Sequence, residues 1–113
     1  MTWMESGGVD VVRAHEDLLE GAACEELERQ LERAARDGRH VVVALAAGAK
    51  LSARALGVLA HAAGEAGRAG GALVVCAEDE AQRWVLAVTG LAAVLTVRAS
   101  ETEAIAALQA HAA

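Results

Sequence analysis

The run Val-Val-Val-Ala-Leu at residues 41–45 decides the fold of this chain. It is short, rich in β-branched residues and free of polar side chains, which is typical of a central strand covered on both faces. A loop over residues 46–51 follows, and Ser52 then stands where a helix N-cap is expected. We therefore predict a buried strand over residues 41–45 and a helix over about 53–69.

Apolar residues recur at helical spacing in the segment that follows Ser52. The buried stripe of this helix is expected to hold Leu56, Leu59, Ala63 and Ala66. Gly57 and Gly64 interrupt the same segment, and glycine weakens a helix through its backbone entropy. We expect the helix to pack closely on the sheet at these two glycines.

The chain downstream repeats the alternation of strand and helix. A glycine pair at residues 70–71 leads into a second buried strand over residues 72–76. Asp79 and Gln82 then form a capping signal, in which Asp79 bonds forward and Gln82 reaches back to the start of the helix. This third helix is expected to run to about residue 89 and to end at Gly90.

Elements are also expected at the two ends of the chain. A last strand over residues 95–97 precedes a terminal helix that Ser100 caps and that runs to about residue 108. At the start, strands over residues 2–4 and 9–15 flank the glycine pair at 7–8. A glycine pair supplies the positive φ angles of a tight hairpin turn, so these two strands are expected to be antiparallel.

A helix is predicted over about residues 22–37, after a loop over residues 16–21. Its apolar face holds Ala23, Cys24, Leu27, Leu31, Ala34 and Ala35. Gly38 is expected to end it.

The order of these elements indicates an α/β fold. Strands that alternate with helices after residue 41 need crossover connections, so the sheet is expected to be mainly parallel there and mixed overall. We expect a single domain over residues 1–113, with an N-terminal β-hairpin at 2–15 and a core at 22–110. A sheet of four to five strands is backed by about four helices in this arrangement.

Composition limits the classes of function. The 113 residues are 55% hydrophobic and carry a net charge of −6, with Lys50 as the single lysine. Nucleic acid is not expected as a partner, because phosphate contacts need clustered Lys and Arg. No run is long enough to cross a membrane, and the first residues lack the pattern of a signal peptide. We therefore expect a cytoplasmic protein without direct membrane insertion.

The sequence lacks the residue patterns of catalysis and metal binding. No glycine-rich loop ends in Lys-Ser or Lys-Thr, as a phosphate-binding loop would. The four histidines are not paired at ligand spacing, and the strand over residues 41–45 has no phospho-accepting Asp at its end. Cys24 and Cys76 are too few for a zinc site or a disulfide framework. We expect no enzyme activity, no catalytic residue, no metal and no cofactor.

Residues 41–108 resemble the STAS domain, the family of anti-sigma-factor antagonists and of the cytoplasmic domains of sulphate transporters. The family's apolar strand, short loop and Gly-Leu-Gly-Val-Leu helix start are similar to residues 41–59. The glycine pair at 70–71 matches the family's Gly-Gly before the next strand. Its Leu-x-x-x-Gly-Leu is similar to residues 86–91, and its closing helix to residues 101–108. The resemblance implies a STAS-like fold and a non-enzymatic protein-interaction domain.

This sequence departs from the family at the phosphorylation motif. In typical antagonists a kinase phosphorylates the serine directly after the Asp that opens the second helix, and phosphate blocks binding. Here the strand-end Asp is Ala44, the helix-opening Asp is Ser52, the acceptor serine is Ala53 and the next hydroxyl residue is Arg54. The resemblance therefore implies a domain that is not switched at the usual serine. Ser52 is either an N-cap or a substitute acceptor one position early.

The same resemblance places a partner-binding surface at Ser52, Ala53, Arg54 and Ala55, to which Trp84 is a further candidate. Arg54 is either a solvated residue of the first helical turn or a partner contact. Trp84 is either a half-buried packing residue or an interface anchor, a role in which Trp is enriched.

Several partners are compatible with these residues. The resemblance favours an anti-sigma-factor kinase or another STAS protein. A role as a soluble accessory subunit of a lipid-type membrane transporter, or as a component of a multi-STAS sensory assembly, is the alternative. Trp3 is expected to cover the hairpin edge or to mediate self-association, and a homodimer is a further option.

Overall fold

A computed structural model describes residues 2–6, 8–14 and 21–112, which form one mixed five-stranded sheet with the strands in sequence order. The first two strands pair antiparallel and every later pair is parallel. The strands are β1 (Thr2–Ser6), β2 (Val9–Ala14), β3 (His40–Leu45), β4 (Ala72–Ala77) and β5 (Thr96–Arg98). The expected α/β fold with a mixed sheet is confirmed.

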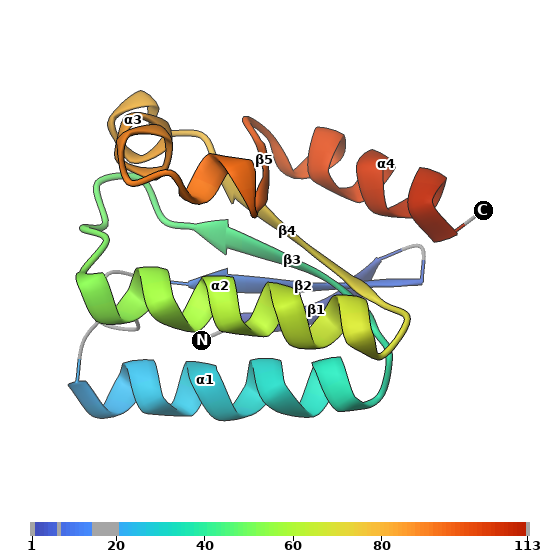
Figure 1. Cartoon of the computed structure of the whole chain (residues 1–113). Coiled ribbons are helices and arrows are strands. Elements are labelled where there is room, and N and C mark those ends of the chain that lie inside the picture. Colours follow the sequence, from blue (N-terminus) through green and yellow to red (C-terminus); the bar gives the residue numbers. More distant parts are fainter. Residues whose placement is uncertain (1, 7, 15–20, 113) are drawn as a thin grey trace.

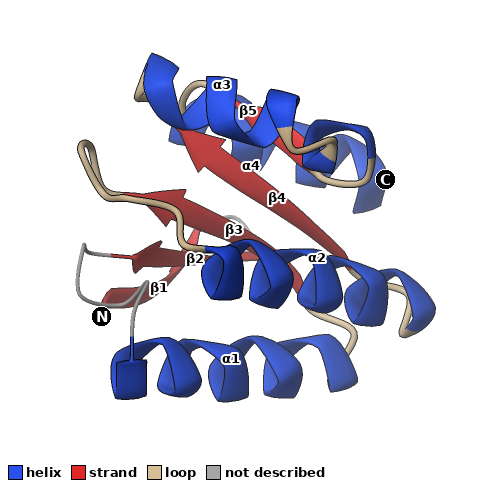
Figure 2. Cartoon of the chain, turned by 60° about the vertical axis from the view of Figure 1, so that its left-hand side comes forward, coloured by secondary structure: helices blue, strands red, loops and turns tan. Residues whose placement is uncertain are grey.

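The helices lie on both faces of this sheet (Figures 1 and 2). Two of them, α1 and α2, run side by side on one face, and α4 covers the other. The described helices are α1 (Gly21–Arg36), α2 (Ala53–Arg68), α3 (Glu80–Val88) and α4 (Glu101–Ala112), with a short 3₁₀ turn, η2 (Leu91–Ala93), after α3.

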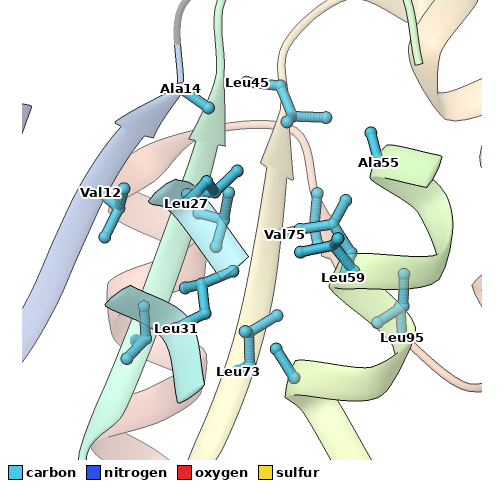
Figure 3. Close-up of a cluster of buried hydrophobic side chains, with 14 of the residues drawn as sticks. Val12, Ala14, Leu27, Leu31, Leu45, Ala55, Leu59, Leu73, Val75 and Leu95 are labelled. Carbon is cyan, nitrogen blue, oxygen red and sulfur yellow. The ribbon is translucent and has the colours of Figure 1, made fainter. Parts of the chain in front are cut away.

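The apolar run in β3 is explained by this layering. Val41, Val43 and Leu45 belong to the core beneath α1 and α2, part of which is shown in Figure 3. Val42 and Ala44 point the other way and pack with α4. Side chains alternate between the faces of a strand, so a strand buried on both faces is apolar throughout.

The buried stripe of α2 is wider than expected and shifted by one position. Its buried residues are Ala55, Val58, Leu59, Ala62 and Ala66. Leu56 and Ala63, which the spacing placed in the core, are only partly buried. The reason is that α2 packs against both the sheet and α1, so the middle of its stripe lies between these two neighbours.

The expected close packing at the helix glycines is wrong. A Cβ atom added to Gly57 would meet nothing within 4 Å, and one added to Gly64 would approach the guanidinium of Arg68, at 3.7 Å from the nearer nitrogen. Both glycines lie on the exposed side of α2. Nothing in the structure requires a glycine at either position.

Several boundaries differ slightly from the expectations. The last strand begins at Thr96, because Leu95 is buried in the core before the strand starts. The stops at Gly38 and Gly90 are confirmed by left-handed φ angles of 68° and 80°. Gly7, His15 and the loop expected over residues 16–20 lie outside the described residues, as does the side chain of Ala23.

Candidate functional site

The loop between β3 and α2 lies at the carboxyl ends of the parallel strands, and α3 lies at the same end of the sheet (Figure 1). The carboxyl ends of parallel strands are where open α/β sheets build their binding sites. The loop runs over residues 46–52 and leads directly into the first turn of α2. The residues that the sequence analysis predicts as a partner surface therefore lie at or near this end of the sheet.

The start of α3 holds this loop through the Asp79 carboxylate. One oxygen accepts the backbone N–H of Gly48 at 3.0 Å, and the other accepts the backbone N–H of Ala81 at 2.9 Å. The second bond is the N-cap of α3 that the sequence predicts. Both bonds favour the ionised form, so the Gly48 bond first and the Ala81 bond second lower the pKa of Asp79.

Gln82 supplies a second attachment, and here the predicted capping role is wrong. Its side-chain nitrogen donates to the carbonyl oxygens of Ala46 and Ala49, at 2.9 and 2.8 Å. The side chain is directed toward the loop because Gln82 lies on the inner face of α3, where it is 4% exposed. The loop is thus cross-linked to α3 by one carboxylate and one amide.

The loop also satisfies part of its own backbone. The N–H of Ala46 donates to the Ala14 carbonyl at 2.9 Å, which continues the pairing of β2 and β3 by one residue. The N–H of Ala49 donates to the Ala46 carbonyl at 3.1 Å, and Gly48 between them has a φ of 80°. Together with the bonds from α3, this gives the loop a defined shape before any partner arrives.

Ser52 is the N-cap of α2. Its backbone is extended, with φ −73° and ψ 161°, and its Oγ accepts the N–H of Ala55 at 3.1 Å. Ala53, where the sequence resemblance places the phosphoacceptor, is exposed and presents a methyl group. Ala55, in contrast, is 1% exposed and points into the core (Figure 3). Ala55 therefore has no surface to offer a partner, and only residues 52–54 of the expected segment do.

Arg54 lies exposed on the first turn of α2, and its guanidinium approaches Glu25 of α1 at 3.3 Å. The side chains of Arg54 and Glu25 are 47% and 53% exposed, so this ion pair is worth at most about 1 kcal/mol. Such a pair holds the arginine loosely and leaves it accessible.

Trp84 is more exposed than expected. Its exposed fraction is 65%, which does not agree with a half-buried packing residue. Val88, one helical turn further along α3, is 58% exposed. The reason is that α3 turns Gln82 and Leu86 inward and presents the opposite side to solvent. Exposed apolar side chains that adjoin on one helix are typical of an interaction surface.

A shallow pocket of about 280 Å³ lies between the loop and α3. It is lined by Gly48, Ala49, Lys50, Leu51, Asp79, Ala81, Gln82 and Val85. We call Ser52, Ala53, Arg54, Trp84 and Val88 the α2–α3 surface.

Among the residues that the structure describes, the remaining candidates for chemistry do not gather into a site. Cys76 lines a second pocket, of about 200 Å³, together with Ala44, Arg13 and Glu101. Burial, with a smaller contribution from nearby carboxylates, raises the pKa of the Cys76 thiol to about 11, so it is protonated at neutral pH. Within the described residues no three potential metal ligands are grouped, and no helix is long and apolar enough to cross a membrane.

The contact of Gln82 with the loop is the feature that sequence reasoning missed. The spacing of Asp79 and Gln82 marked this turn correctly, but the acceptors of Gln82 lie 36 and 33 positions earlier in the chain. A local capping rule therefore could not find them.

Comparisons with known proteins agree with this geometry. A family model described as "STAS domain" matches residues 4–104. The solution NMR structure of the protein TM1081 superposes with a TM-score of 0.75 at 16% sequence identity, covering 95% of this chain and 86% of that one. At this identity the likeness concerns the fold. No curated protein sequence matches the chain at a significant level.

Proposed function

Because this chain belongs to the STAS domain family, we propose that it acts as a non-enzymatic protein-interaction domain of the anti-sigma-factor-antagonist type. STAS domains are generally interaction domains without enzymatic activity. The proposed partner is an anti-sigma-factor kinase or another STAS protein, met in the cytoplasm. The proposed contact is the α2–α3 surface, with Trp84 as its anchor.

One observation carries the proposal, namely the exposed methyl group of Ala53 at the start of α2, directly after a loop that is hydrogen-bonded to α3. The position that receives phosphate in typical antagonists has no oxygen here. The neighbouring Ser52 hydroxyl caps α2 through its bond from the N–H of Ala55. The side chains of Asp79 and Gln82 hold the loop before α2 in place, and these hydrogen bonds do not need a phosphate at the start of α2. We propose that the α2–α3 surface binds its partner without a prior change of conformation, and that phosphorylation does not turn this binding on or off.

The electrostatics of the surface support the same proposal. A phosphate adds about −1.5 to −2 charges, and on a contact surface that charge repels or is poorly desolvated. Ala53 has no side-chain hydroxyl group that could receive a phosphate. Arg54 stays accessible beside it because its ion pair with Glu25 is exposed.

The experiment is a binding titration with a purified kinase-type anti-sigma factor from the same organism. Trp84→Ala is expected to weaken binding by about 30-fold, the loss produced when a hot-spot Trp is truncated. Val94→Ala is the matched control, because Val94 is 67% exposed but lies outside the α2–α3 surface. The control should bind like the wild type.

Two outcomes count against the proposal. Equal affinity of the wild type and Trp84→Ala for the partner would show that Trp84 does not anchor the contact. Failure of the wild type to bind any anti-sigma factor or STAS protein, together with specific capture of transporter subunits, would move the function to membrane traffic.

A further inference from the structure

The two edges of the sheet differ in a way that points to a partner for one of them. The β5 edge is three residues long and carries the exposed Arg98. Short, charged edge strands resist pairing with another chain. The β1 edge is five residues long, holds Trp3 and Met4, and has Glu5 as its one charged residue. In the described part of the chain β1 pairs with one strand, β2, so its outer edge is unpaired.

We propose that a second copy of this chain pairs with β1, strand against strand and antiparallel, so that two sheets join into one of ten strands. An antiparallel edge is complementary to itself, as a two-fold symmetric contact requires. Side chains directly opposite one another must lie on the same face of the joined sheet. This condition and the residues of β1 together fix the register.

The faces of β1 follow from its pairing with β2. Trp3 lies opposite Val12 and packs on the core under α1 and α2. Met4 lies opposite Val11, whose side chain belongs to the face covered by α4. Side chains alternate along a strand, so Glu5 shares the face of Trp3. Trp3 can therefore face only Trp3 or Glu5 of the partner subunit.

Strand overlap selects between these two registers. A register that sets Trp3 against the partner's Trp3 pairs only residues 2–4 of β1 with the same residues of the partner, and it leaves Glu5 and Ser6 without an opposite residue in β1. The register in which all residues of β1 overlap instead sets Met4 against the partner's Met4 and Trp3 against the partner's Glu5. It also covers Met4, which is 39% exposed in the single chain. This arrangement pairs the outward backbone N–H and C=O groups of β1, buries apolar surface and keeps Glu5 away from the partner's Glu5.

Sedimentation of the intact chain over about 1 µM to 1 mM tests the proposal directly. The wild type should show a reversible monomer–dimer equilibrium. Met4→Glu should raise the dimer dissociation constant about tenfold or more, because two carboxylates would then face each other across the two-fold axis. The single chain should tolerate this change, since the sulfur of Met4 lies 3.9 Å from a guanidinium nitrogen of Arg13. Val94→Glu is the matched control and should dimerise like the wild type.

Disulfide trapping tests the register separately from the affinity. Directly opposite residues on antiparallel strands bring their Cβ atoms within about 4.5–5.5 Å, close to the range that a disulfide spans. Met4→Cys should therefore form a covalent dimer on mild oxidation, whereas Val94→Cys should not. The native Cys24 and Cys76 are buried and should not contribute. A wild type that stays monomeric at about 1 mM would overturn the proposal, as would a dimer that Met4→Glu leaves intact.

Discussion

Gln82 holds the loop between β3 and α2 through two hydrogen bonds from one side-chain nitrogen. Its bonds reach the carbonyls of Ala46 and Ala49, on either side of the left-handed Gly48. An amide nitrogen can donate twice, and both donors are used here. The residue therefore determines where the loop lies relative to α3, although it is nearly hidden from solvent.

Gln82→Met is expected to lower the free energy of unfolding by about 1–3 kcal/mol, because it keeps the side-chain volume but removes the side-chain donor from the buried Ala49 carbonyl and one of the two donors to the Ala46 carbonyl. Urea unfolding at 25 °C measures the change. Gln82→Glu should be at least as damaging, since a carboxylate would then face the same two carbonyl oxygens. Stability within about 0.5 kcal/mol of the wild type for both variants would show that the amide does not hold the loop.

Asp79 makes the stability of the loop depend on pH. Its pKa is lowered in the folded chain, chiefly by the N–H of Gly48 and then by that of Ala81. A carboxylate with a lowered folded pKa stabilises the fold fully above its unfolded pKa of about 3.9 and loses this contribution as the pH falls through the folded pKa. Asp79→Asn should therefore differ most from the wild type near neutral pH.

The measurement is the unfolding free energy of the wild type and Asp79→Asn between about pH 7 and pH 2. The difference between the two should narrow as the pH falls below about 4. A difference that stays constant over this range would mean that the ionised carboxylate is not the group that matters.

Local rules at this scale predicted the helix caps and failed at longer range. Ser52, Asp79 and Ser100 each accept a backbone N–H of the first helical turn, as their residue types and positions indicate. The bonds of Gln82 could not be predicted, because their acceptors are distant in sequence. The burial of Ala55 was missed because it depends on which way α2 rotates against α1 and the sheet.

At the scale of elements, α2 carries two glycines on its exposed side that contribute no packing. Gly57→Ala should raise the free energy of unfolding by about 0.5–1 kcal/mol, because alanine has less backbone entropy to lose and its Cβ meets nothing within 4 Å. Thermal unfolding of the purified domain measures this.

Gly71→Ala is the contrasting variant, since an added Cβ would lie 2.5 Å from the Arg39 carbonyl oxygen. This variant should be destabilised. If Gly57→Ala were destabilised as well, Gly57 would have a role that its surroundings do not explain.

Most of these helices and strands could be predicted from the sequence, because the spacing of the apolar residues and the glycines at the turns indicate the same elements. The apolar runs in β3 and β4, the helical spacing in α1 and the glycines at the turns all indicate the same fold. The orientation of α3 could not be predicted in the same way. Its nine residues bury only Gln82 and Leu86, whereas the apolar Trp84 and Val88 are exposed, so hydropathy does not mark the inner face of this helix.

At the scale of the molecule, helices cover both faces of the sheet, the proposed contact surface lies beside the carboxyl end of β3, and β1 forms one outer edge of the sheet. The crossover rule and the hairpin predicted a mixed sheet that is parallel after residue 41, but the order of the strands comes from the structure. The exposure of Trp84 and the unpaired β1 edge depend on how the finished elements meet solvent. Neither feature has a local pattern in the sequence.

The central claim is that this STAS domain binds its partner without a phosphorylation switch at the start of α2. The most direct measurement is binding of the chain to the kinase-type anti-sigma factor in the presence of ATP or ADP, with phosphate on residues 52–54 followed by mass spectrometry. We expect no phosphate on these residues and the same affinity with either nucleotide. Phosphorylation of Ser52 with a loss of affinity in ATP would contradict the claim.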